Sequence, residues 1–114
     1  MTEDQLLIAV LELAKFAGWR VTHFRPARTS RGWRTAVQGD KGWPDLMICG
    51  HGRFLVVELK ASGGKLSEEQ LRWQDELVLA GVEYQVWRPI DWTEGMIAGE
   101  LGCAGGVIPH REEG

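Results

Sequence analysis

The chain has 114 residues, of which 44% are hydrophobic and 25% charged, and its formal net charge is −3. These values are those of one globular domain with a modest core, and no apolar run approaches the length of a membrane span. The first residues, Met-Thr-Glu-Asp-Gln, are acidic, which is unlike a secretory signal. We therefore expect one cytoplasmic domain without membrane attachment, with Cys49 in a buried strand and both Cys49 and Cys103 reduced.

The first predicted element is a helix over residues 2–17, capped by Thr2 and ended by Gly18. Glu3 falls in line with the apolar stripe, whereas Glu12 falls on the opposite, solvent side. Glu3 is either a favourable partner of the helix dipole or a contribution to a cationic site, which is the reading we favour. The stripe recurs at helical spacing and comprises Leu6, Val10, Leu13, Ala14 and Ala17.

A strand over residues 19–24 precedes a long segment, residues 25–41, that is rich in arginine. Residues 15–41 contain seven bases and one acid, whereas residues 61–114 contain ten acids and four bases. Arginines interleaved with Trp33, serine and threonine suit phosphate contact and stacking on bases, although an ordinary solvated loop is the alternative. His23 is either a phosphate contact or, as we favour, a strand residue with a satisfied imidazole. The candidate phosphate contacts are Arg25, Arg28, Arg31, Arg34 and Lys41.

Residues 42–60 predict a β-hairpin with charged residues where buried strands should have none. Two apolar runs flank Gly50-His51-Gly52-Arg53, which has turn chemistry. If the middle two are the loop residues, counting outward places Asp45 opposite Glu58, on one face with Cβ atoms about 5 Å apart. The apolar residues occupy both parities, so we expect both faces of these strands to be buried; they are Met47, Ile48, Phe54, Leu55, Val56, Val57 and Leu59.

Asp45, Glu58 and Lys60 share a face because side chains alternate along a strand. Keeping two carboxylates this close both ionised in a low-dielectric site costs electrostatic free energy unless a cation lies beside them. Hard oxygen ligands suit Mg²⁺, which binds one or two carboxylates together with phosphate oxygens and waters. The hairpin therefore predicts a divalent-cation site. A plain surface hairpin with a Glu–Lys pair is the alternative, and the apolar strands argue against it.

Ser67 and Gln70 form a capping box that starts a second predicted helix, which runs to about Ala80 and ends at Gly81. Gln70 has two interpretations, cap and inward site residue, and we expect one side chain to serve only one of them at a time. The expected inward residues are Gln70, Leu71, Trp73, Gln74, Leu77, Val78 and Ala80, and the expected outward residues are Glu68, Arg72, Asp75 and Glu76.

The chain continues with a predicted strand over residues 83–88 and a last helix over residues 92–101. We expect one domain over residues 1–101 and a loosely ordered tail over residues 102–114, which is rich in glycine. The order helix, strand, strand, strand, helix, strand predicts a small α/β sheet with helices packed against it.

Three motifs together are recognisable: Gly42-Trp43-Pro44-Asp45, Glu58-Leu59-Lys60 at the end of the next strand, and Gly64-Lys-Leu-Ser67-Glu-Glu-Gln70. They resemble the VRR-NUC family of the PD-(D/E)xK nuclease superfamily, over roughly residues 3–92. A Pro-Asp pair with Glu-x-Lys alone is a weak signal, and the third motif and the matching element order make it strong. The resemblance implies a restriction-endonuclease-like α/β core with a mixed central sheet.

The resemblance also implies a metal site. Asp45, Glu58 and the backbone carbonyl of Leu59 would bind Mg²⁺ or Mn²⁺, and Glu3 would match the family's acid on the first helix. No organic cofactor is implied.

The implied catalytic residues are Asp45, Glu58, Lys60 and Gln70. Lys60 would match the family's catalytic lysine, which orients or deprotonates the attacking water or stabilises developing charge. Gln70 would match the glutamine of the second helix, and on this ground we favour its site role over its cap role. Lys65, in the turn before that helix, joins the candidate DNA contacts.

The implied function is a metal-dependent DNA endonuclease that hydrolyses phosphodiester bonds. The short chain resembles stand-alone phage or bacterial members, which are homodimeric and cut branched DNA such as Holliday junctions or flaps. We therefore expect a DNA-repair type of substrate, a homodimer, and the cytoplasm of a bacterial or phage-infected bacterial cell. The alternatives are a non-catalytic DNA-binding module and a structural subunit of a phage or repair complex, each with a nuclease-like fold.

Overall fold

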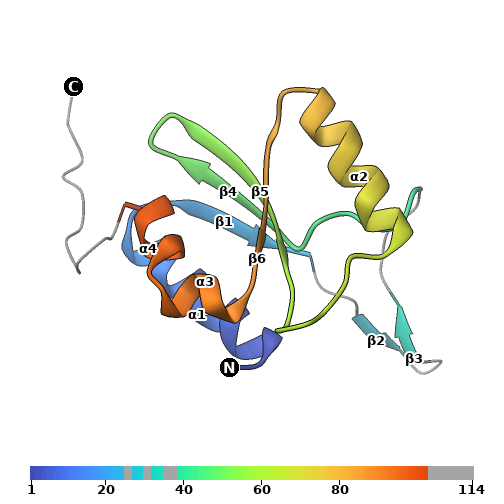
Figure 1. Ribbon diagram of the computed structural model, residues 1–114, viewed down its shortest axis with the longest axis horizontal. Coiled ribbons are helices and arrows are strands. Elements are labelled where there is room, and N and C mark those ends of the chain that lie inside the picture. Colours follow the sequence, from blue (N-terminus) through green and yellow to red (C-terminus); the bar gives the residue numbers. More distant parts are fainter. Residues whose placement is uncertain (25–26, 30–31, 35–38, 103–114) are drawn as a thin grey trace.

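The protein is described by a computed structural model that covers residues 1–24, 27–29, 32–34 and 39–102 (Figure 1). Capping residues and apolar periodicity place the elements, and the two longer helices each begin with a capping box, Thr2 with Gln5 and Ser67 with Gln70. In chain order the elements are α1 (Glu3–Phe16), β1 (Arg20–His23), β2 (Ala27–Thr29), β3 (Gly32–Arg34), β4 (Leu46–Gly50), β5 (Arg53–Leu59), α2 (Glu68–Leu79), β6 (Glu83–Trp87), α3 (Pro89–Thr93) and α4 (Met96–Glu100).

A four-stranded mixed sheet with the order β1-β4-β5-β6 forms the centre of the molecule. β4 pairs antiparallel with both β1 and β5, and β6 runs parallel to β5 after the crossover through α2. Figure 1 shows α1, α3 and α4 on one side of the sheet and α2 on the other. The predicted α/β fold with a mixed central sheet is confirmed.

The hydrophobic core lies between the sheet and α1. Alternate residues of β4 and β5 face this side, and they pack with α1 and with Ile97 and Leu101 near the C-terminal helices. The indole N–H of Trp19 donates to the Leu101 carbonyl at 3.1 Å, which ties β1 to the end of α4. The fully buried core side chains of the sheet and α1 include Leu6, Val10, Ala14, Leu46, Ile48, Leu55 and Val57.

The β4–β5 hairpin has the predicted register, because Gly50 pairs with Arg53 and Leu46 with Val57. His51 and Gly52 have φ angles of 50° and 75°, and positive φ at both central positions is what a type I′ turn requires. His51 Nε2 lies 2.9 Å from the Ala17 carbonyl oxygen, and its ring meets Trp19 edge-on. The turn is therefore held against the end of α1.

Two parts of the chain differ from the prediction. Residues 27–34, expected to lie in a long loop, contain the strands β2 and β3, which pair antiparallel as a separate two-stranded sheet. The single helix expected over residues 92–101 is two short helices, because Gly95 adopts a φ of 81° between α3 and α4. Pro89 starts the first of them, three residues earlier than expected.

The expectation that both faces of the hairpin are buried is wrong for β4 and for the start of β5. The face that carries Met47, Cys49 and Phe54 is covered by α2 only near β6, so Cys49 is exposed and Phe54 is 39% exposed. The uncovered half forms an open groove of about 530 Å³, with Lys15 and Arg20 at its rim. Cys103 and the rest of the expected tail, residues 103–114, lie outside the described residues.

The apolar side of α2 is also less covered than expected. Gln70, Trp73, Gln74 and Leu77 are half-buried, but Leu71, Val78 and Ala80 are exposed. None of the helices in the described ranges is long and apolar enough to cross a membrane.

Candidate active site

Asp45 and Glu58 lie opposite each other where the strands of the hairpin end. Because Leu46 pairs with Val57, the next pair outward is Asp45 and Glu58, as the turn length predicted. Asp45 Oδ2 accepts a hydrogen bond of 2.8 Å from the backbone N–H of Leu59. Glu58 is 2% exposed and is the one charged residue buried among the described residues. The fold thus places one buried and one half-buried carboxyl group together.

Gln70 connects α2 to this pair. Its Oε1 accepts from the backbone N–H of Ser67 at 2.8 Å, and its Nε2 donates to Glu58 Oε1 at 2.8 Å. The expectation that Gln70 is either a cap or a site residue is therefore wrong. The amide has an acceptor end and a donor end, so one side chain serves both roles.

The surroundings of Glu58 favour its protonated form. The pKa of the Glu58 carboxyl is raised to about 8, chiefly by burial and then by the charge of Asp45, while Lys60 opposes the rise. The Lys60 ammonium nitrogen lies 3.9 Å from Glu58 Oε1. The pair is therefore favourable with a proton on Glu58, and a divalent cation can take the place of that proton.

Close packing holds the Asp45 segment against α2. Gly42 has a φ of 93°, and a Cβ at this position would lie 2.6 Å from the backbone carbon of Glu69. The backbone N–H of Phe24 donates to the Asp45 carbonyl at 2.9 Å. Trp43 packs edge-on against both Phe24 and Trp73 of α2, with ring centroids 6.2 and 4.8 Å apart.

The loop after Lys60 is fixed from the opposite side by Arg88. Its Nη1 donates to the Ala61 carbonyl at 3.0 Å and to the Gly64 carbonyl at 2.6 Å. The Lys60 N–H donates to the Trp87 carbonyl at 3.0 Å. Lys60 is therefore placed by β6 as well as by its own strand.

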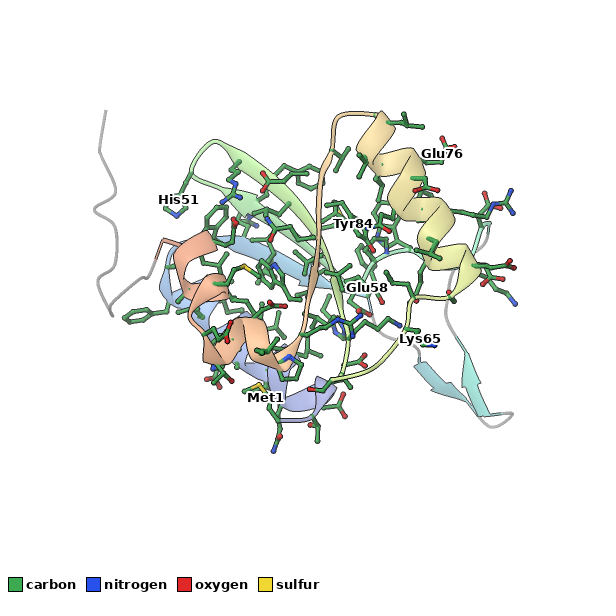
Figure 2. The ribbon with its side chains drawn as sticks, in the orientation of Figure 1. Met1, His51, Glu58, Lys65, Glu76 and Tyr84 are labelled. Atoms are coloured by element: carbon green, nitrogen blue, oxygen red, sulfur yellow. The ribbon has the colours of Figure 1, made fainter. Side chains whose placement is uncertain are left out.

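Tyr84 is a residue of this region that sequence reasoning did not single out. It lies on β6, on the face that carries Glu58, and Figure 2 shows both side chains between the sheet and α2. Burial raises the pKa of the Tyr84 phenol, and the charges of Glu58 and Asp45 add to the rise. Once the β5–β6 pairing is assumed, strand alternation alone would have placed Tyr84 on this face.

The residues present fit a partly hydrated cation better than a full protein cage. Within the described part of the chain, no three Asp, Glu, His or Cys side chains gather as a metal site, and Glu3 on α1 is exposed and does not join Asp45 and Glu58. Mg²⁺ is commonly held by one or two carboxylates while phosphate and water supply the other ligands. Leu59 follows Glu58 directly, and its N–H is the group that contacts Asp45.

The structure describes four of the six predicted DNA contacts, and these lie in different parts of the fold. Arg25 and Arg31 lie outside the described residues, and Arg28 and Arg34 lie on β2 and β3. Lys65 is exposed in the loop before α2 (Figure 2). Lys41 lines an open pocket of about 410 Å³ beside α2, together with Arg72, Trp73 and four acids, Asp40, Glu69, Asp75 and Glu76.

His23 pairs with Leu46 in the sheet. It therefore faces the α1 side, away from Asp45 and Glu58. This placement agrees with the strand interpretation of His23 rather than with a phosphate contact beside the site.

Comparison with known proteins agrees with this geometry. A search of curated proteins finds no match. The family model of the VRR-NUC domain matches residues 20–89, which is more than half of the chain and includes Asp45, Glu58, Lys60 and Gln70. The chain therefore belongs to the VRR-NUC family of PD-(D/E)xK-type nucleases, and its function is of the nuclease type, with DNA as the substrate.

Proposed function

We propose that this protein is a divalent-cation-dependent DNA endonuclease that cuts branched DNA. The observation that carries the proposal is the pairing of the Asp45 and Glu58 carboxyl groups. Gln70 hydrogen-bonds to Glu58, and Lys60 forms an ion pair with it. A buried acid pair of this kind is costly for the fold unless a proton or a cation lies between the two groups. Such a cost is expected at a functional site rather than in a structural core.

Asp45 and Glu58 are the proposed ligands of Mg²⁺ or Mn²⁺, with the Leu59 carbonyl beside them. A cation bound there would lower the pKa of a coordinated water and neutralise charge on the scissile phosphate. Glu58 must give up its proton when the cation binds, so cation affinity should rise with pH up to about 8. Glu3 remains a proposed ligand only through the resemblance, since the structure leaves it exposed.

Lys60 and Gln70 have distinct proposed roles. The Lys60 ammonium group, beside Glu58, stabilises the negative charge that develops on the phosphate as water attacks phosphorus and an ester oxygen leaves. Gln70 fixes the orientation of Glu58 by occupying Oε1, which leaves Oε2 for the cation.

The branched substrate, the homodimer and a DNA-repair role rest on the resemblance to stand-alone family members. A two-fold dimer would present two sites for paired cuts. Arg25, Arg28, Arg31, Arg34, Lys41 and Lys65 are the proposed DNA contacts. Among these, Lys65 lies in the loop that joins β5, the strand of Glu58, to α2.

The test is cleavage of labelled junction, flap, splayed-arm, duplex and single-stranded DNA with Mg²⁺, Mn²⁺ or EDTA. We expect cation-dependent cutting that favours branched DNA, and loss of about 100-fold or more in Asp45→Asn and Lys60→Ala. Asp75→Asn, an exposed acid of α2, is the matched control and should cut normally. Circular dichroism of each variant establishes that it is folded.

Two results would contradict the proposal. Normal cutting by Asp45→Asn or Lys60→Ala would overturn the site assignment. A wild-type chain that binds DNA and cuts none of these substrates with either cation would favour the non-catalytic DNA-binding module.

A further inference from the structure

The buried polar atoms without a partner are confined to one region. Among the described residues, four buried side-chain atoms have no hydrogen-bond partner: Trp43 Nε1, Glu58 Oε2, Trp73 Nε1 and Tyr84 OH. Trp43 precedes the Pro44–Asp45 pair, Trp73 lies one turn after Gln70 on α2, and Tyr84 and Glu58 come from paired strands. Buried polar groups in folded proteins are almost always paired, so such a cluster indicates a bound species that the protein atoms alone do not supply.

Tyr84 and Glu58 are the two members of this set that lie on the sheet. Tyr84 pairs with Val56, two residues before Glu58, so the two side chains are diagonal neighbours on one face. With neighbouring strands about 4.8 Å apart and a rise of about 3.3 Å per residue, such neighbours lie about 8 Å apart at the backbone, within reach of an aromatic side chain. Figure 2 shows Tyr84 on β6 and Glu58 on β5 on the side of the sheet where α2 lies.

Glu58 Oε2 and the Tyr84 hydroxyl can be linked by a cation and one of its water molecules. Glu58 Oε1 is occupied by the Gln70 amide, while Oε2 has no donor. The Tyr84 hydroxyl, which can both donate and accept, has no hydrogen-bond partner in the protein. A water molecule bound to a cation at Glu58 is polarised to donate its hydrogens, and the phenol oxygen can accept one of these hydrogen bonds.

We propose that the Tyr84 hydroxyl oxygen accepts a hydrogen bond from a water molecule in the hydration shell of the cation bound by Asp45 and Glu58. The inference rests on the proposed function, because it assumes that these two carboxylates hold the cation. Tyr84 is then a positioning residue: it acts on the cation through the water. Mg²⁺ keeps several of its waters when it binds to protein, and residues that hold such waters tune its affinity.

The test is Tyr84→Phe in the full chain, which removes the hydroxyl and keeps the ring. Cation affinity is measured without DNA, from the rise in Tm as Mg²⁺ is added. We expect an unchanged or slightly higher Tm without cation, because the lost hydroxyl has no protein partner. The apparent Kd for Mg²⁺ should rise about tenfold. Thr93→Val is the control, since it removes a hydroxyl from α3 on the other side of the sheet.

The outcomes separate this inference from the proposed function. If Mg²⁺ raises the Tm of the wild type and of Tyr84→Phe with equal Kd, Tyr84 does not hold a water of the cation, and the proposed function stands. If Tyr84→Phe changes only the KM for DNA, the hydroxyl contacts the substrate instead, which also overturns the inference. If Mg²⁺ and Mn²⁺ stabilise neither protein, the cation site itself is wrong.

Discussion

The fold favours the protonated form of the Glu58 carboxyl group at pH values where most carboxyl groups have already ionised. The pKa is about 8 in the folded chain against an ordinary value of 4.5, chiefly because of burial. Between these two values the folded state binds more protons than the unfolded state. The free energy of unfolding without cation therefore falls as pH rises from about 4.5 to 8, with a slope of at most about 1.4 kcal/mol per pH unit.

Glu58→Gln should remove this pH dependence, because the amide does not ionise. We expect the variant to lose less stability than the wild type between pH 5 and 8, measured by urea denaturation in EDTA. Glu12→Gln is the matched control, since Glu12 is exposed on α1 and should leave the wild-type slope in place. Equal slopes in the wild type and Glu58→Gln would show that Glu58 ionises normally.

Gln70 allows its two roles to be separated by substitution. Gln70→Glu keeps an acceptor for the Ser67 N–H, so the capping box survives, but it puts a second carboxyl group against Glu58. We expect a folded protein whose cleavage rate falls by about tenfold or more. Ser67→Ala should do the reverse, with a loss of about 1 kcal/mol in stability and normal cleavage. Normal cutting by Gln70→Glu would assign Gln70 to the cap alone.

At the residue scale, the sequence predicted best those features that follow from counting residues along a strand or around a turn. A two-residue turn and the alternation of side chains were sufficient to pair Asp45 with Glu58. The double role of Gln70 was missed because the side chain was treated as one contact rather than as a donor and an acceptor. Tyr84 was missed because an aromatic residue in a short strand is normally a core residue, and only its unpaired hydroxyl distinguishes it.

At the scale of elements, the site depends on how closely the segment before β4 approaches α2. Gly42→Ala should be destabilising for two reasons: a φ of 93° and a contact of 2.6 Å with the Glu69 backbone. The backbone strain alone is worth about 1–3 kcal/mol. Gly52→Ala is the matched control, because its φ is 75° but its Cβ would meet nothing within 4 Å.

The measurement is the free energy of unfolding of both variants. We expect Gly42→Ala to lose about 1–3 kcal/mol more than Gly52→Ala, which is the overpacking contribution. Cleavage should fall in Gly42→Ala even where it stays folded, since Asp45 moves relative to Gln70. Equal losses in the two variants would mean that the approach to α2 is not tight.

Each element that was mispredicted has its own physical cause. Periodicity identifies the apolar side of α2 but not how much of it another element covers, so the exposure of Leu71 and Val78 was not foreseen. β2 and β3 have no apolar alternation, and their pairing is a local backbone arrangement that composition does not reveal. The break between α3 and α4 depended on Gly95, whose positive φ could have been anticipated from its identity.

At the scale of the whole molecule, α2 leaves an apolar strip on the surface. Val78 is 56% and Leu79 82% exposed, and Leu71, about two turns earlier on the same side of α2 as Val78, is exposed as well. A second copy of the chain is the occupant that the proposed homodimer supplies. The sheet edge formed by β6 lies beside this helix, so the dimer would cover both.

Leu79→Glu should therefore weaken self-association. We expect light scattering to give twice the chain mass for the wild type and a single chain mass for the variant at the same concentration. Ile8→Glu, a similarly exposed apolar residue on α1, is the control and should remain dimeric. A wild type that is monomeric throughout the assay range would contradict the dimer, and a dimeric Leu79→Glu would place its interface elsewhere.

The uncovered half of the sheet has a practical use. Cys49 is exposed there, on the same face as Asp45 and four residues along β4, which is about 13 Å at about 3.3 Å per residue. With Cys103 replaced by serine, a fluorophore on Cys49 would sit near the carboxyl pair without touching any residue assigned to it. The native sequence thus supplies an attachment point from which the arrival of DNA and of the cation can be followed separately by optical spectroscopy.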